Sequence, residues 1–276
     1  MAETAGLSRE ELRSATEREW YHTIELAPGI VTPGWFDTRK IVHELPFPAS
    51  LEGKRCLDIA TFDGFWAFEM ERRGAAEVVA IDILDPGAWD WPVNSPREMI
   101  DAMERRKEGG RGFEVASAAL ASSVTYRECS VYDLDPEEHG EFDFVYLGSL
   151  LMHLRDPVGA LERVRSVCRG QLLVVDNINL LLTLLLRRTP AGLLYGMGRP
   201  WWWNVNFAGL VRLVEIGGFR LVQPAKRVYM PAGPGHPFPR WDRQLLVNSE
   251  ARHFMLARLK GDPHAAILVE PVRDLG

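Results

Sequence analysis

The sequence is poor in cysteine and has no excess of basic charge. Its three cysteines, Cys56, Cys129 and Cys168, lie far apart and lack the paired spacing of a zinc site or a disulfide framework. We interpret them as reduced thiols of a cytoplasmic protein and predict no metal site. Lys and Arg total 32 against 38 Asp and Glu, so the net charge of −6 argues against a protein that grips phosphate backbones along its whole surface.

Long apolar runs are also absent. The most apolar stretch, residues 178–186, ends at Arg187 and Arg188 and has about half the length that spans a bilayer. We interpret it as a buried helix or lid, and membrane contact is the alternative. The first twenty residues are polar and acidic, unlike a signal peptide, which favours a cytoplasmic protein without a membrane partner.

What the sequence does contain is a regular alternation of short apolar runs with amphipathic stretches. This pattern is typical of a parallel sheet covered by helices on both faces. We predict strands at residues 55–60, 77–81, 124–129, 142–147, 171–176, 219–223 and 253–259, and helices that include residues 64–73, 158–167 and 206–216. The expected fold is a Rossmann-like α/β domain with a seven-stranded, mostly parallel sheet.

Two regions flank or interrupt this alternation. Residues 1–50 are predicted to form an N-terminal helical cap and active-site loop: a helix from a capping box at Ser8 and Glu11 to about residue 20, an aromatic loop over 20–35, and a helix over 36–45 that stops at Pro46. Residues 51–276 form the main domain. Within it we expect an insertion at 85–123 that carries a helix over 96–107, a lid at 178–205, and a surface excursion at 224–240.

The connection between the first two predicted strands has the features of a nucleoside site. Asp58 lies in the first strand, the loop Ala60-Thr61-Phe62-Asp63-Gly64 follows, and Asp82 and Ile83 end the second strand. Such a loop lies at the switch point of the sheet, where a carboxylate suits the two hydroxyls of a ribose. A helix cap or turn is the alternative role of Asp82. A dinucleotide is disfavoured because Asp63 would repel its pyrophosphate.

Residues 56–82 resemble motif I of class I S-adenosylmethionine (SAM)-dependent methyltransferases. Asp58 and Gly64 are retained, whereas Ala60 and Phe62 replace two of the usual glycines, so the Phe62 ring must turn away from SAM or form part of the pocket wall. The resemblance implies SAM as cofactor, adenine contacts from Val131, Tyr132 and Asp133, and contacts to the methionine part from Leu147, Gly148 and Ser149. Asp133 has helix capping as its alternative role. The altered loop leaves a SAM-binding protein without transfer activity as an alternative function.

Several stretches, among them GSLLMHLRDPVGALERV and WNVNFAGLVRLVEIGGF, resemble a narrower group, the tRNA wobble-uridine 5-oxyacetate-forming enzymes that use carboxy-SAM. This similarity implies cofactor contacts from Trp35 and Lys40. Two positions depart from the group, which has a Lys near Tyr21-His22 and a Tyr at Met152. Without that cation and hydroxyl, carboxy-SAM would bury a poorly paired charge, so we predict SAM itself.

The acceptor is predicted from the residues around the expected sulfonium position. His153 and His22 are candidate general bases, with a structural, hydrogen-bonded histidine as the alternative. An acceptor pocket could be walled by Tyr21, Met152, Tyr195, Trp202, Trp203 and Asn204, with aromatic packing between lid and sheet as the alternative. We therefore expect a small-molecule acceptor. The alternative acceptor, tRNA, requires a phosphate-binding cluster at Arg105, Arg106, Lys107 and Arg111, which is otherwise a solvated helix face.

Overall fold

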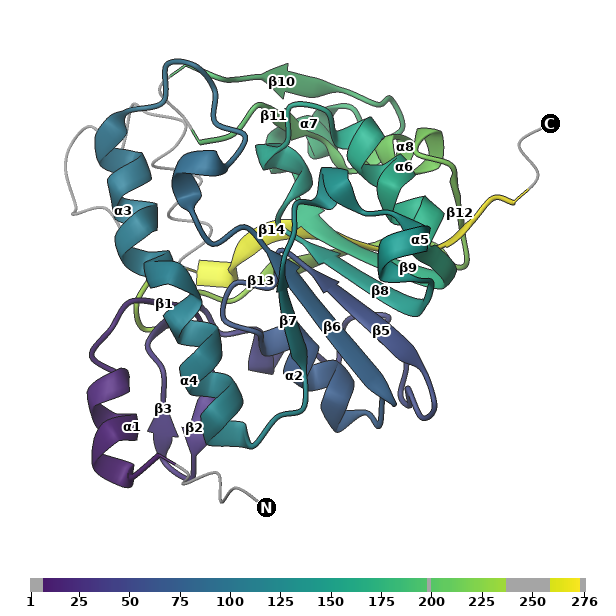
Figure 1. Cartoon of the computed structure of the whole chain (residues 1–276). Helices are drawn as coiled ribbons and strands as arrows, with labels where there is room; N and C mark the ends of the chain where they lie inside the picture. Colours follow the sequence, from purple (N-terminus) through teal and green to yellow (C-terminus); the bar gives the residue numbers. More distant parts are fainter. Residues whose placement is uncertain (1–6, 198–199, 237–258, 274–276) are drawn as a thin grey trace.

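The computed structural model describes residues 7–197, 200–236 and 259–273 of the chain (Figure 1). Its centre is an eight-stranded sheet in the order β12-β14-β9-β8-β5-β6-β7, with β13 paired to β14. These strands are β5 Arg55–Ile59, β6 Glu77–Asp82, β7 Thr125–Glu128, β8 Phe142–Gly148, β9 Cys168–Asn177, β12 Phe219–Leu221, β13 Lys226–Met230 and β14 Asp262–Pro271. Strands β5 to β9 are parallel, and β14 runs antiparallel to β9, β12 and β13.

This topology confirms the predicted Rossmann-like sheet. The chain builds β5, β6 and β7 outward in one direction and then returns to place β8 on the other side of β5, which creates the switch point between β5 and β8. Two strands of the sheet lie outside the predicted ranges: β13, which forms inside the expected excursion at 224–240, and β14. The strand expected at 253–259 falls largely on residues 253–258, which lie outside the described residues.

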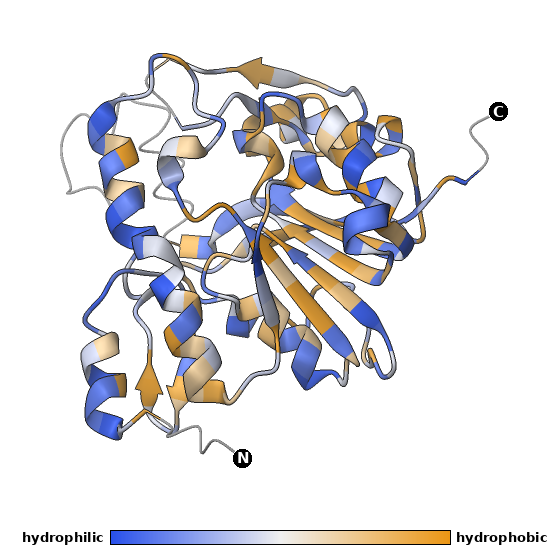
Figure 2. Ribbon diagram, viewed as in Figure 1, coloured by the Kyte–Doolittle hydropathy of each residue, from blue (hydrophilic) through white to orange (hydrophobic). Residues whose placement is uncertain are grey.

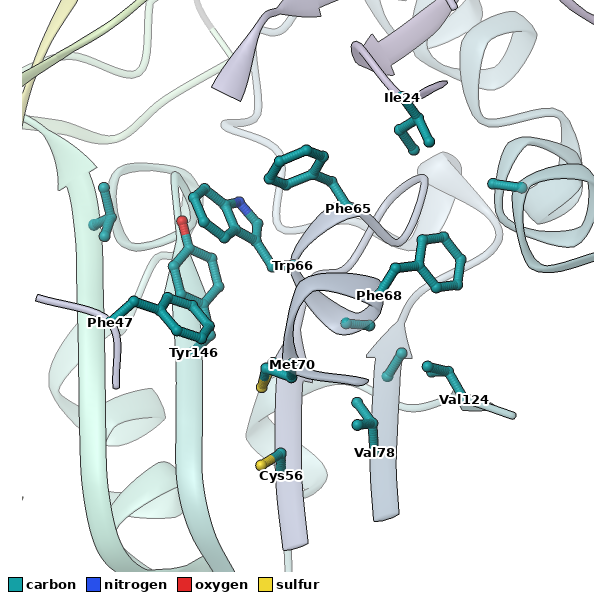
Figure 3. Packing of buried hydrophobic residues seen from close by; sticks show 14 of the residues in the cluster. Ile24, Phe47, Cys56, Phe65, Trp66, Phe68, Met70, Val78, Val124 and Tyr146 are labelled. Carbon is teal, nitrogen blue, oxygen red and sulfur yellow. The ribbon is translucent and has the colours of Figure 1, made fainter. Parts of the chain in front are cut away.

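Both faces of the sheet are buried, which explains the continuous apolar character of its strands. Cys56 packs toward α2 (Phe65–Arg72), whereas its neighbour Leu57 packs toward α6 (Pro157–Val167) and α8 (Phe207–Ile216). Figure 2 shows the sheet interior in orange. Figure 3 shows aromatic side chains of α2, with Trp66 beside Tyr146 of β8 at a ring-centroid distance of 4.5 Å.

The N-terminal region differs from the expected helical cap. Helix α1 begins at the predicted capping box but covers only Arg9–Ala15. The expected aromatic loop contains short strands: β1 Trp20–His22 pairs in parallel with β4 Gly34–Phe36, and β2 Glu25–Ala27 pairs with β3 Ile30–Val31. The helix expected at 36–45 was wrong, and only a 3-10 turn at Thr38–Lys40 forms. Here the Asp37 N–H donates to the Pro231 carbonyl, a long-range pairing that local sequence does not indicate.

The insertion contains the predicted helix, α3 Arg97–Lys107, followed by a second one, α4 Arg111–Leu120. The segment expected to be a buried helix forms α7 Leu180–Leu185, but several of its leucines are exposed and its Thr183 is buried. After it, β10 Gly192–Leu194 pairs with β11 Trp203–Val205. Two further short elements are the 3-10 turn Pro86–Ala88 and α5 Pro136–His139. In the described part of the chain, no helix is long and apolar enough to cross a membrane.

Candidate active site

A cavity of about 1450 Å³ lies at the carboxyl ends of the parallel strands. Each of β5 to β9 contributes to its wall at or just beyond its last residue, through Ala60, Asp82, Ser130, Ser149 and Asn177. Ligands of open α/β sheets bind at this edge. Because a pocket for one ligand typically measures about 300–1,000 Å³, this volume accommodates a cofactor together with a second molecule.

The loop after β5 keeps the backbone of a glycine-rich loop although it has lost two glycines. Ala60 and Phe62 adopt φ values of 57° and 51°, a left-handed conformation that costs a non-glycine residue about 1–2 kcal/mol. Gly64 also has a positive φ, and a Cβ there would lie 2.6 Å from the Phe68 ring, so no other residue fits. The Phe62 ring lines the cavity and packs on Tyr21 at 5.0 Å, which makes it part of the pocket wall.

Three polar residues, Asp58, Thr61 and Asp63, stabilise this loop from the side away from the cavity and do not line it. Asp58 accepts hydrogen bonds from the Thr61 hydroxyl at 2.6 Å and the Ala67 N–H at 3.1 Å, and burial raises its pKa to about 7. Asp63 accepts from the backbone N–H groups of Tyr21 at 2.6 Å and His22 at 2.9 Å, and burial raises its pKa to about 6. Asp63 thus ties the N-terminal strand β1 to the loop. With Gly64, these residues set the shape of the site from outside the cavity.

Asp82 stands in the cavity wall with its carboxylate held in place. Its Oδ2 accepts from the Phe62 N–H at 2.8 Å, and its Oδ1 accepts from the Ile83 N–H at 2.8 Å. The carboxylate also forms an ion pair with Lys107, the last residue of α3, whose side chain is completely buried. A carboxylate has about four lone-pair sites and these contacts use three, which leaves room for a further donor from the cavity.

Lys107 and Arg106 are therefore interior residues, and they form neither the phosphate-binding cluster that the alternative tRNA acceptor requires nor a solvated helix face. The Arg106 guanidinium lies 3.4 Å from the centre of the Trp35 ring and pairs with Glu19 at 2.6 Å. Arg111 is paired with Glu114, so of these four basic residues Arg105 alone is exposed and forms no ion pair with the described part of the chain. The last turn of α3 packs against Trp35 and Asp82 of the cavity wall. The charges of Arg106 and Lys107 therefore do not face a nucleic acid.

The residues expected from the family resemblance divide into two groups. Val131, Tyr132, Gly148, Ser149, Ile83 and Trp35 line the cavity. Asp133 is exposed outside it, Leu147 is buried beneath it, and Lys40 is an exposed side chain paired with Asp37 at 3.2 Å. The structure thus does not bring Asp133, Leu147 or Lys40 to the cavity wall.

The two predicted histidines lie in different environments. His22 is buried behind Tyr21, stacks on Phe65 at 5.7 Å and does not line the large cavity. Burial lowers its pKa to about 3, and its position outside the cavity does not support its assignment as a base. His153 lines the cavity, and its Nδ1 lies 2.8 Å from the Pro200 carbonyl. Burial lowers the pKa of His153 as well.

The sequence prediction missed two further imidazoles of the cavity wall, His236 and His264. His264, in β14, has its Nδ1 2.9 Å from the Asp262 carbonyl and its Nε2 3.1 Å from the Ser149 hydroxyl. It lies in the stretch DPHAAILVE, and no sequence motif marks it, because only the antiparallel pairing of β14 with β9 brings it beside β8. Asp90, Trp89 and Trp91 of the insertion were also missed as wall residues.

The predicted acceptor wall is present in part. Tyr21, Met152, Tyr195 and Asn204 line the cavity, and so does Trp201. Trp202 and Trp203 do not, because their indole N–H groups donate to the backbone carbonyls of Asp90 at 2.7 Å and Leu154 at 2.9 Å. These two tryptophans hold the β11 region onto the insertion and onto the segment after β8, which is the packing role considered as their alternative.

Residues 37–219, about two thirds of the chain, match the model of the methyltransferase domain family. The chain belongs to this family. It is a class I SAM-dependent methyltransferase, with SAM as the methyl donor.

Solved structures share its fold at low sequence identity. The N-terminal domain of EvdMO1, solved with S-adenosylhomocysteine and D-fucose, is 14% identical with a TM-score of 0.54, over 99% of this chain and 100% of that one. The methyltransferase in complex with the Haloferax volcanii Trm112 activator is 13% identical with a TM-score of 0.52, over 88% and 91% of the two chains. No curated protein sequence matches the chain.

The charge of the methyltransferase cavity fits its cofactor. Among the described residues that line it are four aspartates, Asp82, Asp90, Asp156 and Asp262, and one arginine, Arg155, which pairs with Asp90 at 3.1 Å. An acidic wall favours a ligand that carries a sulfonium and an ammonium group. The same wall disfavours a ligand with an additional carboxylate, because no unpaired basic side chain of the described residues lines the cavity to receive it.

Proposed function

We propose that this methyltransferase transfers the methyl group of SAM to a small, partly apolar molecule enclosed in the cavity. The observation that carries the proposal is the continuity of the cavity. It extends from Asp82 and the strand ends to an aromatic wall that includes Tyr21, Trp35, Tyr195 and Trp201. An enclosed wall that is mainly apolar, with a few polar groups, suits a small ligand.

In this proposal one end of the cavity binds the cofactor and the other binds the acceptor. Asp82 accepts a ribose hydroxyl, Val131 and Tyr132 contact the adenine, and Gly148 and Ser149 contact the methionine part. When bound, SAM supplies an electrophilic methyl group on sulfonium. The chain contributes alignment of the acceptor and exclusion of water by the aromatic wall, the two requirements of an in-line displacement.

His153 is the proposed general base. A backbone carbonyl only accepts hydrogen bonds, so the contact with Pro200 assigns the proton to Nδ1 and leaves Nε2 as the accepting nitrogen. Burial lowers the pKa of His153, which keeps the ring neutral and leaves the Nε2 lone pair free to face the acceptor. His264 has the same arrangement, with Nδ1 on the Asp262 carbonyl, and its Nε2 accepts from Ser149. We assign this pair to positioning the acceptor.

The interior position of Arg106 and Lys107 and the acidic wall favour this proposal over tRNA modification. A tRNA anticodon needs an open, basic approach, and neutralising its phosphates makes affinity fall steeply with salt. The cavity charge also favours SAM over carboxy-SAM.

The proposal is tested by methyl transfer from labelled SAM to a metabolite extract free of RNA, with wild-type protein and the variant His153→Gln. General base catalysis contributes about 10²–10⁴-fold, so kcat should fall by about that factor while SAM affinity is unchanged. His43→Gln, at an exposed site, is the matched control. Absence of any labelled product from the extract, together with tight and salt-sensitive binding of bulk tRNA, would refute the small-molecule acceptor. Full kcat in His153→Gln would refute the base assignment alone.

A further inference from the structure

Exposed apolar side chains gather at one place on the methyltransferase. Thirteen large hydrophobic residues are exposed in the described part of the chain, and seven of them fall within residues 181–197. We call these seven the apolar rim: Leu181, Leu184, Leu185, Leu186, Leu193, Leu194 and Met197. Scattered exposed leucines are ordinary in proteins, whereas a cluster of this kind marks an interaction surface. In Figure 2 the strand β10, which carries two of the seven, is orange at the top of the molecule.

The outward direction of these leucines is fixed by hydrogen bonds. Helix α7 has the sequence LLLTLL, and it turns its one polar residue, Thr183, into the protein. The Thr183 hydroxyl donates to the Asn179 carbonyl at 2.7 Å and accepts from the Phe207 N–H at 3.0 Å. At the other end of α7, the buried Asn206 amide donates to the Leu186 carbonyl at 2.9 Å. The orientation is the reverse of that of an ordinary surface helix, which buries its apolar side chains.

The rim is continuous with the wall of the active-site cavity. Leu181, Leu184 and Leu193 are exposed and also line the cavity, so the rim forms part of its mouth. A molecule that enters past these side chains meets an apolar surface from the solvent to the aromatic wall near His153. Such an entrance suits an acceptor with a large apolar part.

Two arginines stand at the end of this rim. Arg187 and Arg188 come after Leu186, the C-cap residue of α7, and are exposed, and within the described residues neither pairs with an acidic side chain. Twelve of the other twenty arginines in the described part of the chain form ion pairs within it, for example Arg155 with Asp90 and Arg169 with Asp143. Exposed leucines flanked by unpaired basic residues are the composition of helices that lie in the surface of anionic membranes.

We propose that the apolar rim docks on an anionic bilayer and that the acceptor is a lipophilic molecule dissolved in that bilayer, with its nucleophilic group reaching His153 through the cavity mouth. This rests on the proposed function and specifies its substrate class. The leucines enter the boundary between headgroups and acyl chains, and Arg187 and Arg188 contact the anionic headgroups.

The first test is flotation of the full chain with vesicles of phosphatidylcholine alone and of phosphatidylcholine mixed with phosphatidylglycerol. Wild-type protein should float with the mixed vesicles, and added salt should weaken this binding. Leu185→Ser/Leu194→Ser, two rim positions outside the cavity wall, should reduce binding by at least about tenfold, because each leucine loses apolar area to the membrane. Arg187→Ser/Arg188→Ser should reduce it by about fivefold for each charge removed. Ile216→Ser, an exposed apolar residue of α8 outside the rim, is the matched control.

The second test separates this inference from the proposed function. SAM affinity is measured in every variant, and methyl transfer from labelled SAM is followed into a total lipid extract and into an aqueous metabolite extract. Label in the lipid phase, with normal SAM affinity in the rim variants, supports the proposal. Label confined to aqueous products, or no vesicle binding by a protein that binds SAM normally, overturns it and leaves the small-molecule methyltransferase intact. Concentration-dependent dimerisation abolished by the leucine variants would also overturn it, since the rim would then be a contact between two copies of the chain.

Discussion

The ion pair between Asp82 and Lys107 leads to a testable prediction, because removing the carboxylate should lower both the folding stability and the affinity for SAM, and the two effects can be measured separately. Asp82→Ala deletes the acceptor for the ribose and also leaves a fully buried ammonium group without its partner. Breaking a buried pair in this way costs about 3–5 kcal/mol of folding free energy. Losing charge-assisted hydrogen bonds to SAM costs about 1.5–3 kcal/mol of binding, or about tenfold to a hundredfold in affinity.

The two consequences are separated by a second substitution. In Asp82→Ala/Lys107→Met both charges are replaced by apolar groups, so most of the lost stability should return while SAM affinity stays low. Lys107→Met alone should bind SAM much as the wild type does, because Asp82 still accepts from the backbone N–H groups of Phe62 and Ile83 and retains its place in the wall. Asp85→Asn, at an exposed carboxylate just beyond the same strand, is the control for both measurements.

Unfolding free energies come from denaturant titrations and dissociation constants from calorimetry with SAM. If Asp82→Ala were as stable as the wild type, the buried pair would not exist in solution. If its SAM affinity were unchanged in a folded protein, the ribose assignment would fail. If Lys107→Met instead removed SAM binding, Lys107 would act on the cofactor itself.

Other predictions follow from the same residues. Ala60→Gly should raise the free energy of unfolding by up to about 1 kcal/mol, because φ at Ala60 is positive and the relief exceeds the added chain entropy; a loss of stability in thermal or denaturant unfolding would contradict this. The folded-state pKa of Asp58 is about 7 against an ordinary value of 3.8, so the folded chain binds a proton that the unfolded chain has released between about pH 4 and 7. Stability should therefore fall as pH rises through that window, by up to about 1.4 kcal/mol per pH unit, and Asp58→Asn should flatten the slope; an unchanged slope would assign it to other groups. Calorimetry should give tighter binding of SAM than of carboxy-SAM, since the acidic wall offers no cation to a second carboxylate, and tighter binding of carboxy-SAM would restore the carboxymethyl-transfer alternative.

The parts of the fold that were predicted correctly are those with a strong local signal. The strands β5, β6, β8 and β9 are rich in apolar residues, and α2, α6 and α8 have clear capping residues or glycine stops. The errors lie where distant contacts overrule local preference. Residues 36–45 form no α-helix because the chain at Phe36 and Asp37 pairs with residues 231 and 232. The leucines of α7 are turned outward by contacts with Asn206 and Phe207.

By itself, the sequence determined the parallel sheet, the loop after its first strand and the place of Asp82, because burial on both faces and a strand–loop–helix order leave a readable pattern along the chain. Only the tertiary structure decided which charged side chains lie at the site. From the sequence, Arg106 and Lys107 are interpreted as part of a solvated or phosphate-binding helix face, but α3 turns them inward onto Trp35 and Asp82. His264 became a wall residue because β14 returns antiparallel beside β9. The partner of a charged side chain is set by where distant segments pack, and the sequence of α3 alone does not indicate which of its charged residues will be covered.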